Sequence, residues 1–259
     1  MPDIDWVKCP GGDFVYQDGA HCRIETFHIA RYPVTQAQFQ AFLTAPDGYP
    51  DDRWWTGLTD PERTPGQPRW DLPNHPRETV SWHEAMAFCA WLSDRLGFAV
   101  TLPTEEQWER AAHGIDGYEY LEFAVTFPTE EQWEGAAHGI VGHEYPWGRD
   151  YRRGYANIDE TFNGEGPYRL GQTSAVGAYP EGASPEGVLD LAGNVWEWCV
   201  TEDAKSKRIQ PGGTGSRVLR GGSWLFHQHG AQAAYRLNRA PRFRGVSIGF
   251  RVLCVSPIL

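Results

Sequence analysis

Cysteine is the first side chain in this sequence that could perform chemistry. The sequence contains five cysteines, an odd number, spread far apart and without a C-x-x-C pair. A disulfide framework or a dithiol redox centre needs paired or closely spaced thiols, so we expect reduced, buried thiols instead. They are Cys9, Cys22, Cys89, Cys199 and Cys254.

Histidines and oxygen ligands are the other candidates. None of the nine histidines belongs to an H-x-x-x-H or H-E-x-x-H set, and His227 and His229 would share one side of a strand without a third ligand nearby. Asp190, Asn194 and Glu197 are close enough in sequence for their oxygens to surround a hard cation such as calcium. Capping and turn formation could explain the same three residues.

The stretch from Val218 to Val252 is the most unusual part of the sequence. It begins with alternating basic and apolar residues before Gly221-Gly222 and ends with a second alternating run at residues 248–252. The middle, residues 225–247, follows neither a helical nor a strand period. After this middle we call the whole of Val218–Val252 the unpatterned stretch. Two regular ends around an unpatterned middle suggest a binding surface held on a fixed frame.

Helix signals lie earlier in the chain. Thr35 and Ser81 each open a capping box before apolar residues with helical spacing, so we predict helices after both. Residues 6–29 have the pattern of short strands with a turn at residues 10–12. Asp47–Pro76 is predicted to be an ordered loop held by Trp54, Trp55 and Trp70, and a loop this long is often functional.

An internal repeat follows the second predicted helix. Phe98–Tyr120 and Phe123–Tyr145 are identical at 19 of 23 positions, and each copy contains T-E-E-Q-W, a capping box. Two copies are too few for a solenoid. We interpret the repeat as a tandem duplication in which one copy is an insertion, and the sequence leaves open whether that insertion mediates association.

Composition limits the class of protein. With 259 residues, 41% hydrophobic residues, 29 glycines, 19 prolines and 12 tryptophans, the chain is expected to form a core within a turn-rich fold with little regular structure. The net charge of -11 disfavours general nucleic-acid binding, and no apolar run is long enough for membrane insertion. The start of the sequence lacks the pattern of a signal peptide, so we expect a cytoplasmic protein, with surface display by another factor left open.

A series of short motifs runs along the chain: Trp6-Val7, Gly11-Gly12-Asp13-Phe14, Tyr32-Pro33-Val34-Thr35, Val80-Ser81-Trp82, Leu102-Pro103-Thr104-Glu105-Glu106-Gln107-Trp108, Pro146-Trp147-Gly148, Gly193-Asn194-Val195-Trp196-Glu197-Trp198, Arg220-Gly221-Gly222-Ser223-Trp224 and Gly249-Phe250-Arg251-Val252. In this order they resemble the formylglycine-generating-enzyme (sulfatase-modifying factor) family. The resemblance covers nearly the whole chain and implies a single α+β domain over residues 1–259 with an irregular C-type lectin fold, few short strands and helices, and many loops.

The family's oxygen-using chemistry can be checked at two positions. The enzymes carry a pair of cysteines whose thiolates bind copper, and the matching positions here are Phe226 and Ala231. The resemblance therefore implies a protein that is not an enzyme. A metal-dependent oxidoreductase of the sulfatase-modifying type is the alternative, and a regulatory module that associates through the duplicated segment is a third.

The stretch Val218–Val252 also resembles the variable proteins of diversity-generating retroelements, which end in G-G-S-W followed by I-G-F-R-V. In these retroelements, AAC codons for surface positions are randomised at their two adenines. The resulting codons encode many residue types but not Lys, Glu, Gln, Trp or Met. This resemblance implies a ligand-binding protein with a hypervariable face and an unknown ligand, most simply a protein, although these could also be ordinary loop residues. The implied binding residues are Leu225, Phe226, His227, His229, Gly230, Leu237, Asn238, Arg239, Ala240, Arg242, Phe243, Gly245, Val246 and Ser247.

The resemblance also implies two calcium sites. At one, Asp190 and Glu197 would bind calcium through side chains, and Gly193 and Val195 through carbonyl oxygens. At the other, Asn157 and the Ile158 carbonyl match, but Tyr168 stands where the family has an acidic ligand, which puts this site in doubt. The ligand's identity and the oligomeric state do not follow from the sequence.

Overall fold

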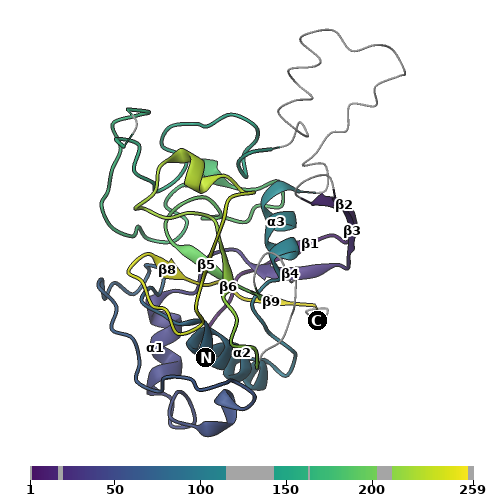
Figure 1. Cartoon of the computed structure of the whole chain (residues 1–259), viewed down its shortest axis with the longest axis vertical. Helices are drawn as coiled ribbons and strands as arrows, with labels where there is room; N and C mark the ends of the chain where they lie inside the picture. The colour runs from purple at the N-terminus through teal and green to yellow at the C-terminus, as the bar shows by residue number, and fades with distance from the viewer. Residues whose placement is uncertain (1, 17–19, 115–142, 163, 203–211, 256–259) are drawn as a thin grey trace.

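Three α-helices and nine short strands, joined by long loops, make up the described part of the chain. The computed structural model describes residues 2–16, 20–114, 143–162, 164–202 and 212–255. Figure 1 shows α1 and α2 together at one end of the molecule and loops dominating the other. The helices are α1 (Gln36–Thr44), α2 (Trp82–Leu96) and α3 (Glu105–His113), with 3-10 turns η2 (Asp52–Trp55), η3 (Pro180–Gly182) and η4 (Gln228–Ala231).

The strands form three small sheets. The first has the order β1-β4-β9, the second is the hairpin β2-β3, and the third has the order β7-β6-β5-β8. In the third sheet β8 pairs with β5 in parallel, and the other neighbours are antiparallel. The strands are β1 (Trp6–Cys9), β2 (Gly12–Tyr16), β3 (Ala20–Ile24), β4 (Phe27–Ala30), β5 (Trp196–Glu202), β6 (Arg217–Arg220), β7 (Arg236–Arg239), β8 (Ile248–Gly249) and β9 (Leu253–Cys254).

The predicted helix starts are confirmed. Thr35, Ser81 and Thr104 are the N-caps of α1, α2 and α3, and each forms a complete capping box with the Gln or Glu three residues later. These bonds satisfy backbone N–H groups that have no partner within the helix. The capping box predicted at Thr129 in the second repeat copy lies outside the described residues.

Tryptophans fill the core, as the composition predicts. Trp82 and Trp198 are fully buried, and their indole N–H groups donate to the carbonyl oxygens of Cys199 and Val80, both at 3.0 Å. The buried indoles therefore tie α2 to β5, because each polar N–H needs a partner inside the protein.

The long loop Asp47–Pro76 is held as predicted by Trp54 and Trp55. Both side chains are buried, and they donate to the carbonyl oxygens of Asp47 (2.7 Å) and Tyr49 (3.0 Å). Trp70 is half-buried and contacts Trp224 edge to face, with ring centroids 5.2 Å apart. The loop therefore reaches the start of the unpatterned stretch.

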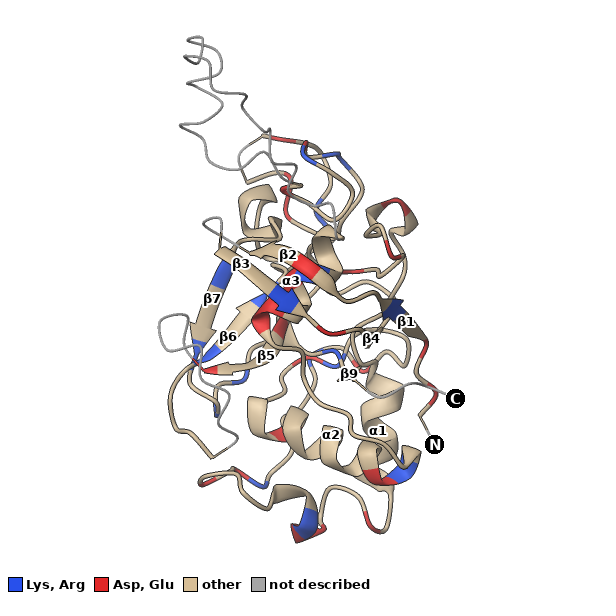
Figure 2. Ribbon diagram, turned by 90° about the vertical axis from the view of Figure 1, so that its right-hand side faces the viewer, with Lys and Arg blue, Asp and Glu red and all other residues tan. Residues whose placement is uncertain are grey.

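Buried ion pairs join α3 to the third sheet. Arg220 of β6 is fully buried between Glu105 and Glu109 of α3, which Figure 2 places beside β6. Arg217, also in β6, lies 4.0 Å from the Trp82 ring centroid. Both arginines of β6 are thus internal, and each has a partner that compensates for its burial.

Among the described residues, no helix is both long and apolar enough to cross a membrane.

Candidate ligand-binding face

The unpatterned stretch starts and ends in the third sheet. It leaves β6 at Arg220, returns as β7, which pairs with β6 in the register Val218 to Asn238, and finishes as β8 beside β5. Gly221 and Gly222 make the turn after β6 with φ of +93° and +75°. A Cβ atom at Gly222 would lie 2.5 Å from the Gly230 carbonyl oxygen, so only glycine fits there.

Main-chain hydrogen bonds hold the stretch against the rest of the protein at intervals along its length. Such bonds do not depend on the side chains of the residues involved, so side chains can change while the backbone path stays fixed. The N–H donor and carbonyl acceptor pairs are Trp224 to Asn194 (3.1 Å), Asp159 to Phe226 (2.9 Å), Ala233 to Glu144 (2.8 Å), Trp82 to Pro241 (3.1 Å), Thr79 to Gly245 (3.0 Å) and Trp196 to Ser247 (2.8 Å).

Most of the predicted binding residues reach the surface. Five are half-buried: Phe226, His227, Leu237, Gly245 and Val246. Seven are exposed: Leu225, His229, Asn238, Arg239, Ala240, Arg242 and Phe243.

Gly230 and Ser247 differ from the prediction because both are buried. A Cβ atom at Gly230 would lie 3.0 Å from the Phe226 side chain, which covers this position. Ser247 is held at the entry to β8, where its carbonyl oxygen accepts the bond from Trp196. These two residues support the face but do not belong to its exposed part.

Residues of the same stretch that were not predicted to bind act as anchors. Arg236 donates to Glu105 Oε1 (2.6 Å) and to the Tyr16 hydroxyl (2.7 Å). Arg244 donates to Glu84 Oε2 (2.7 Å) and to the Thr64 carbonyl oxygen (2.8 Å). Residues whose side chains bond to the rest of the protein, which we call anchors, therefore lie on either side of the exposed residues 238–240, 242 and 243.

His227 and His229 do not share a strand face as expected. His227 precedes η4 and His229 lies within it, with ring centroids 5.4 Å apart at 81°. Within the described ranges, no group of three or more His, Cys, Asp or Glu residues is placed to hold a metal ion. His227 is half-buried and His229 is exposed.

Two aromatic residues that the sequence analysis did not select also lie at the face. Tyr235 is 39% exposed and packs 6.0 Å from the ring of Trp196. Phe162 is 70% exposed and stacks on His227 at 5.1 Å, with an interplanar angle of 8°. Tyr235 could have been predicted as a binding residue, because randomising the first two bases of an AAC codon also yields tyrosine. No local pattern in the sequence marks Phe162.

Phe226 and Ala231, which the resemblance equates with the family's pair of cysteines, carry only hydrocarbon side chains. The Phe226 ring contacts Trp196 edge to face at 5.2 Å, and Ala231 is completely buried. The protein's own cysteines are reduced thiols, and Cys9, Cys89, Cys199 and Cys254 are buried as expected, whereas Cys22 is half-buried. Burial raises the pKa of Cys9 to about 12 and that of Cys254 to about 11, which keeps these thiols protonated at neutral pH.

The acidic residues of the calcium site predicted at Asp190, Gly193, Val195 and Glu197 already have partners in the protein. Glu197 accepts hydrogen bonds from Arg251 Nε (2.6 Å) and Nη2 (2.6 Å) and from the Trp108 indole (2.7 Å). Asp190 Oδ2 accepts from the Gly177 N–H at 2.7 Å, and burial raises the pKa of this carboxyl to about 6. An arginine on both oxygens of Glu197 makes this carboxylate a poor calcium ligand.

The calcium site predicted at Asn157 and Ile158 offers a better oxygen ligand. Asn157 is buried and its amide nitrogen donates to the Gln172 carbonyl oxygen at 3.0 Å. Its Oδ1 atom is buried and accepts no hydrogen bond from any described residue. A buried carbonyl oxygen without a donor suits a cation or a water molecule.

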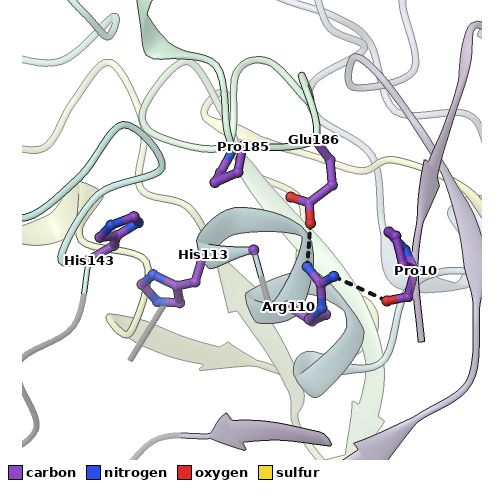
Figure 3. A pocket seen from close by; sticks show the side chains of 7 residues that line it. Pro10, Arg110, His113, His143, Pro185 and Glu186 are labelled. Carbon is purple, nitrogen blue, oxygen red and sulfur yellow. Dashed lines mark hydrogen bonds and ion pairs between the residues drawn. The ribbon is translucent and has the colours of Figure 1, made fainter. Parts of the chain in front are cut away.

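A cavity of about 410 Å³ lies away from these residues, between the end of α3 and the loop that contains Glu186 (Figure 3). Arg110 is buried in its wall and donates to Glu186 Oε1 (2.5 Å) and the Pro10 carbonyl oxygen (3.1 Å). His113 and His143 also line it. Burial lowers the pKa of His113 to about 3, so this imidazole is neutral at physiological pH.

The three small sheets, capped helices and loop-rich half form the irregular C-type lectin fold that the sequence resemblance implies. The chain belongs to the family described as Sulfatase-modifying factor enzyme 1-like domain, which matches residues 3–255.

Named relatives include enzymes and an inactive member. The chain is 29% identical over 281 residues to a formylglycine-generating enzyme of Thermomonospora curvata, covering 88% of this chain and 82% of the relative. It is 30% identical to the hercynine oxygenase of Mycobacterium tuberculosis, of which it spans about half (88% of this chain, 52% of the relative). It is 32% identical to the inactive C-alpha-formylglycine-generating enzyme 2 of Mus musculus, covering 68% of this chain and 47% of the relative.

Two solved structures share the fold. The crystal structure of CarF has a TM-score of 0.66 and 24% identity, covering 97% of this chain and 98% of that one. Treponema denticola variable protein 1 has a TM-score of 0.59 and 21% identity, covering 98% and 95%. At 24% and 21% identity, the similarity to these two structures shows a shared fold only.

Proposed function

We propose that this protein is a non-enzymatic ligand-binding protein whose face, residues 225–247, is diversified by a retroelement. The observation that carries the proposal is the separation of roles along the stretch. Its backbone is held through main-chain atoms and anchor residues, whereas most predicted variable side chains lie at the surface. Such a surface can change without unfolding the protein.

Chemistry of the face favours a protein ligand. Leu225 and Phe243 are 46% and 43% exposed, and the Arg239 guanidinium lies 5.6 Å from the Phe243 ring centroid. Exposed aromatic and arginine side chains are typical of the residues that contribute most to protein–protein binding. The variable protein of Treponema denticola supports the proposal at the level of the fold.

The alternative function is metal-dependent oxidation, as in the named enzymes of the family. It would need ligands where Phe226 and Ala231 stand, and neither side chain can bind copper. Incubation with copper and a cysteine-containing peptide should therefore consume no oxygen above the rate of the peptide alone. Enzyme-dependent consumption would favour the alternative.

The proposal is tested by sequencing the DNA on either side of the gene. We expect a near-copy of the segment that encodes residues 217–252, with adenines at the codons for Leu225, Phe226 and His227, together with a reverse transcriptase gene. A genome without such a copy would rule out diversification by a retroelement. The face would then be the fixed surface of a protein with one dedicated partner.

We also propose calcium as a stabilising ion, with Asn157 and the Ile158 carbonyl as the better supported ligands. The unpaired Asn157 Oδ1 atom supports this site. The contacts of Glu197 with Arg251 argue against the set formed by Asp190, Gly193, Val195 and Glu197.

A further inference from the structure

Large apolar side chains are exposed mainly in two segments of the protein. Among the described residues, eight large hydrophobic side chains are exposed, and six of them belong to these segments. Leu225, Tyr235 and Phe243 lie in the unpatterned stretch, and Phe162, Tyr168 and Leu170 lie in a loop that we call the fixed loop, residues 159–162 and 164–170. Concentrated exposed apolar residues mark interaction sites more often than single ones do.

The fixed loop lies directly beside the unpatterned stretch. The Asp159 N–H donates to the Phe226 carbonyl oxygen at 2.9 Å, and the Phe162 ring stacks on His227. Through this stack Phe162 extends the face beyond residues 225–247.

The fixed loop is also held in place by its own contacts. The Glu160 N–H donates to the Tyr168 carbonyl oxygen (3.0 Å), and Asp159 pairs with Arg169 (3.1 Å). Its base is therefore ordered, while the Phe162 side chain remains 70% exposed. A ring displayed from an ordered base loses little conformational entropy when it enters a partner's pocket.

We propose that the fixed loop is an unvaried second part of the binding face, with Phe162 as a ligand-contacting residue. The partner would be a protein with an apolar pocket for this ring and a carboxylate opposite Arg239, whose exposed guanidinium donates to the Asn238 carbonyl oxygen (2.8 Å) and has further N–H groups for a partner. Phe162 supplies affinity common to all variants, and residues 225–247 supply specificity. This inference rests on the proposed function of the face.

Random peptides displayed on phage provide a defined probe. Peptides are selected against the immobilised full-length protein, and the dissociation constant of the tightest peptide is measured against purified variants. We expect Phe162→Ala to weaken binding about tenfold or more and Phe162→Tyr to stay within about threefold of the unchanged protein. The control is Val255→Ala, which removes another exposed apolar side chain, 56% exposed, after β9 of a different sheet.

A double-mutant cycle separates direct contact from positioning of His227. If Phe162 contacts the ligand, Phe162→Ala weakens binding by a similar factor in the presence and absence of His227→Ala. If Phe162→Ala has no further effect in the His227→Ala background, the ring only positions His227 and the proposal fails.

The outcomes also distinguish this inference from the proposed function. Peptides that depend on Leu225 and Arg239 but not on Phe162 would overturn the fixed loop's role and leave the variable face intact. Peptides that depend on none of these residues, or the absence of any selected peptide, would count against both.

Discussion

Arg244 and Arg242 are two residues apart and have opposite roles. Arg244 is 15% exposed and pairs with Glu84, which is completely buried at the start of α2. Arg242 is 52% exposed and pairs with Asp60, which is 80% exposed. At the scale of single residues, the burial of the partner decides which arginine is structural.

Removing the Arg244 side chain should destabilise the protein. Arg244→Ala leaves the buried Glu84 without its arginine, so we expect the free energy of unfolding to fall by about 3 kcal/mol. The matched control, Arg242→Ala, breaks an exposed pair and should change it by less than about 0.5 kcal/mol. Urea denaturation followed by tryptophan fluorescence measures both, and equal effects would contradict the assignment of Arg244 as an anchor.

His83 makes stability depend on pH. Burial and the Arg217 guanidinium lower the pKa of His83 to about 4, below its ordinary value of 6.5. Between these values the unfolded chain binds a proton that the folded protein does not, so stability is full above pH 6.5 and falls as the pH drops toward 4. Between pH 7 and pH 4.5 the free energy of unfolding should fall by about 2 kcal/mol more in the unchanged protein than in His83→Leu. Urea denaturation at each pH measures this difference. An unchanged pH dependence would show that His83 does not contribute.

At the scale of elements, the unpatterned stretch combines a fixed path with replaceable side chains. β6, β7 and β8 place its ends in one sheet, and main-chain bonds hold the residues between them. Ala231, in the middle of the stretch, is fully buried, whereas its neighbour in sequence His229 is exposed.

Exposed residues of the unpatterned stretch should tolerate substitution better than its buried residues do. Replacing Leu225, His229, Asn238, Arg239 and Ala240 together by serine should lower the free energy of unfolding by less than about 2 kcal/mol, because surface changes are individually small. The single change Ala231→Asn should cost more than about 2 kcal/mol, because it forces a larger polar group into a filled site. Thermal and urea unfolding give both values. Greater damage from the five surface changes would argue against a displayed face.

The whole molecule is held together by contacts between distant parts of the chain, and calcium would act at this scale. The Asn157 side-chain amide donates to the Gln172 carbonyl oxygen and to Asn194 Oδ1, and the Asn194 backbone N–H donates to the Asn157 carbonyl oxygen. A cation at Asn157 would therefore stabilise several loops at once.

Calcium should therefore raise the melting temperature of the protein. Binding to the folded state alone stabilises it in proportion to the logarithm of ligand concentration, so we expect a rise of a few degrees at about 100 times the dissociation constant. Asn157→Ala should melt at the same temperature with calcium and with a chelator. If calcium has no effect on the unchanged protein, a water molecule is the better partner for Asn157 Oδ1.

Local signals in the sequence predicted much of the fold. The capping boxes at Thr35, Ser81 and Thr104 are complete within four residues, so the helix starts follow from adjacent sequence alone. The bounds of the candidate face rest on local signals too, namely Gly221-Gly222 and the alternating ends, and its role in binding stays a prediction. The burial of Gly230 and Ser247 could not be foreseen, because it depends on Phe226 and β5, which no spacing within the stretch reveals.

The sequence by itself determined the family, the helix starts, the tryptophan core and the location of the candidate face. Only the tertiary structure placed Phe162 on His227, Glu84 under Arg244 and Glu197 against Arg251. These contacts join residues between 54 and 160 positions apart, as Glu197 and Arg251 or Glu84 and Arg244 show. Local periodicity and capping arise from neighbours within a few residues, whereas these pairs form only when the whole chain has packed.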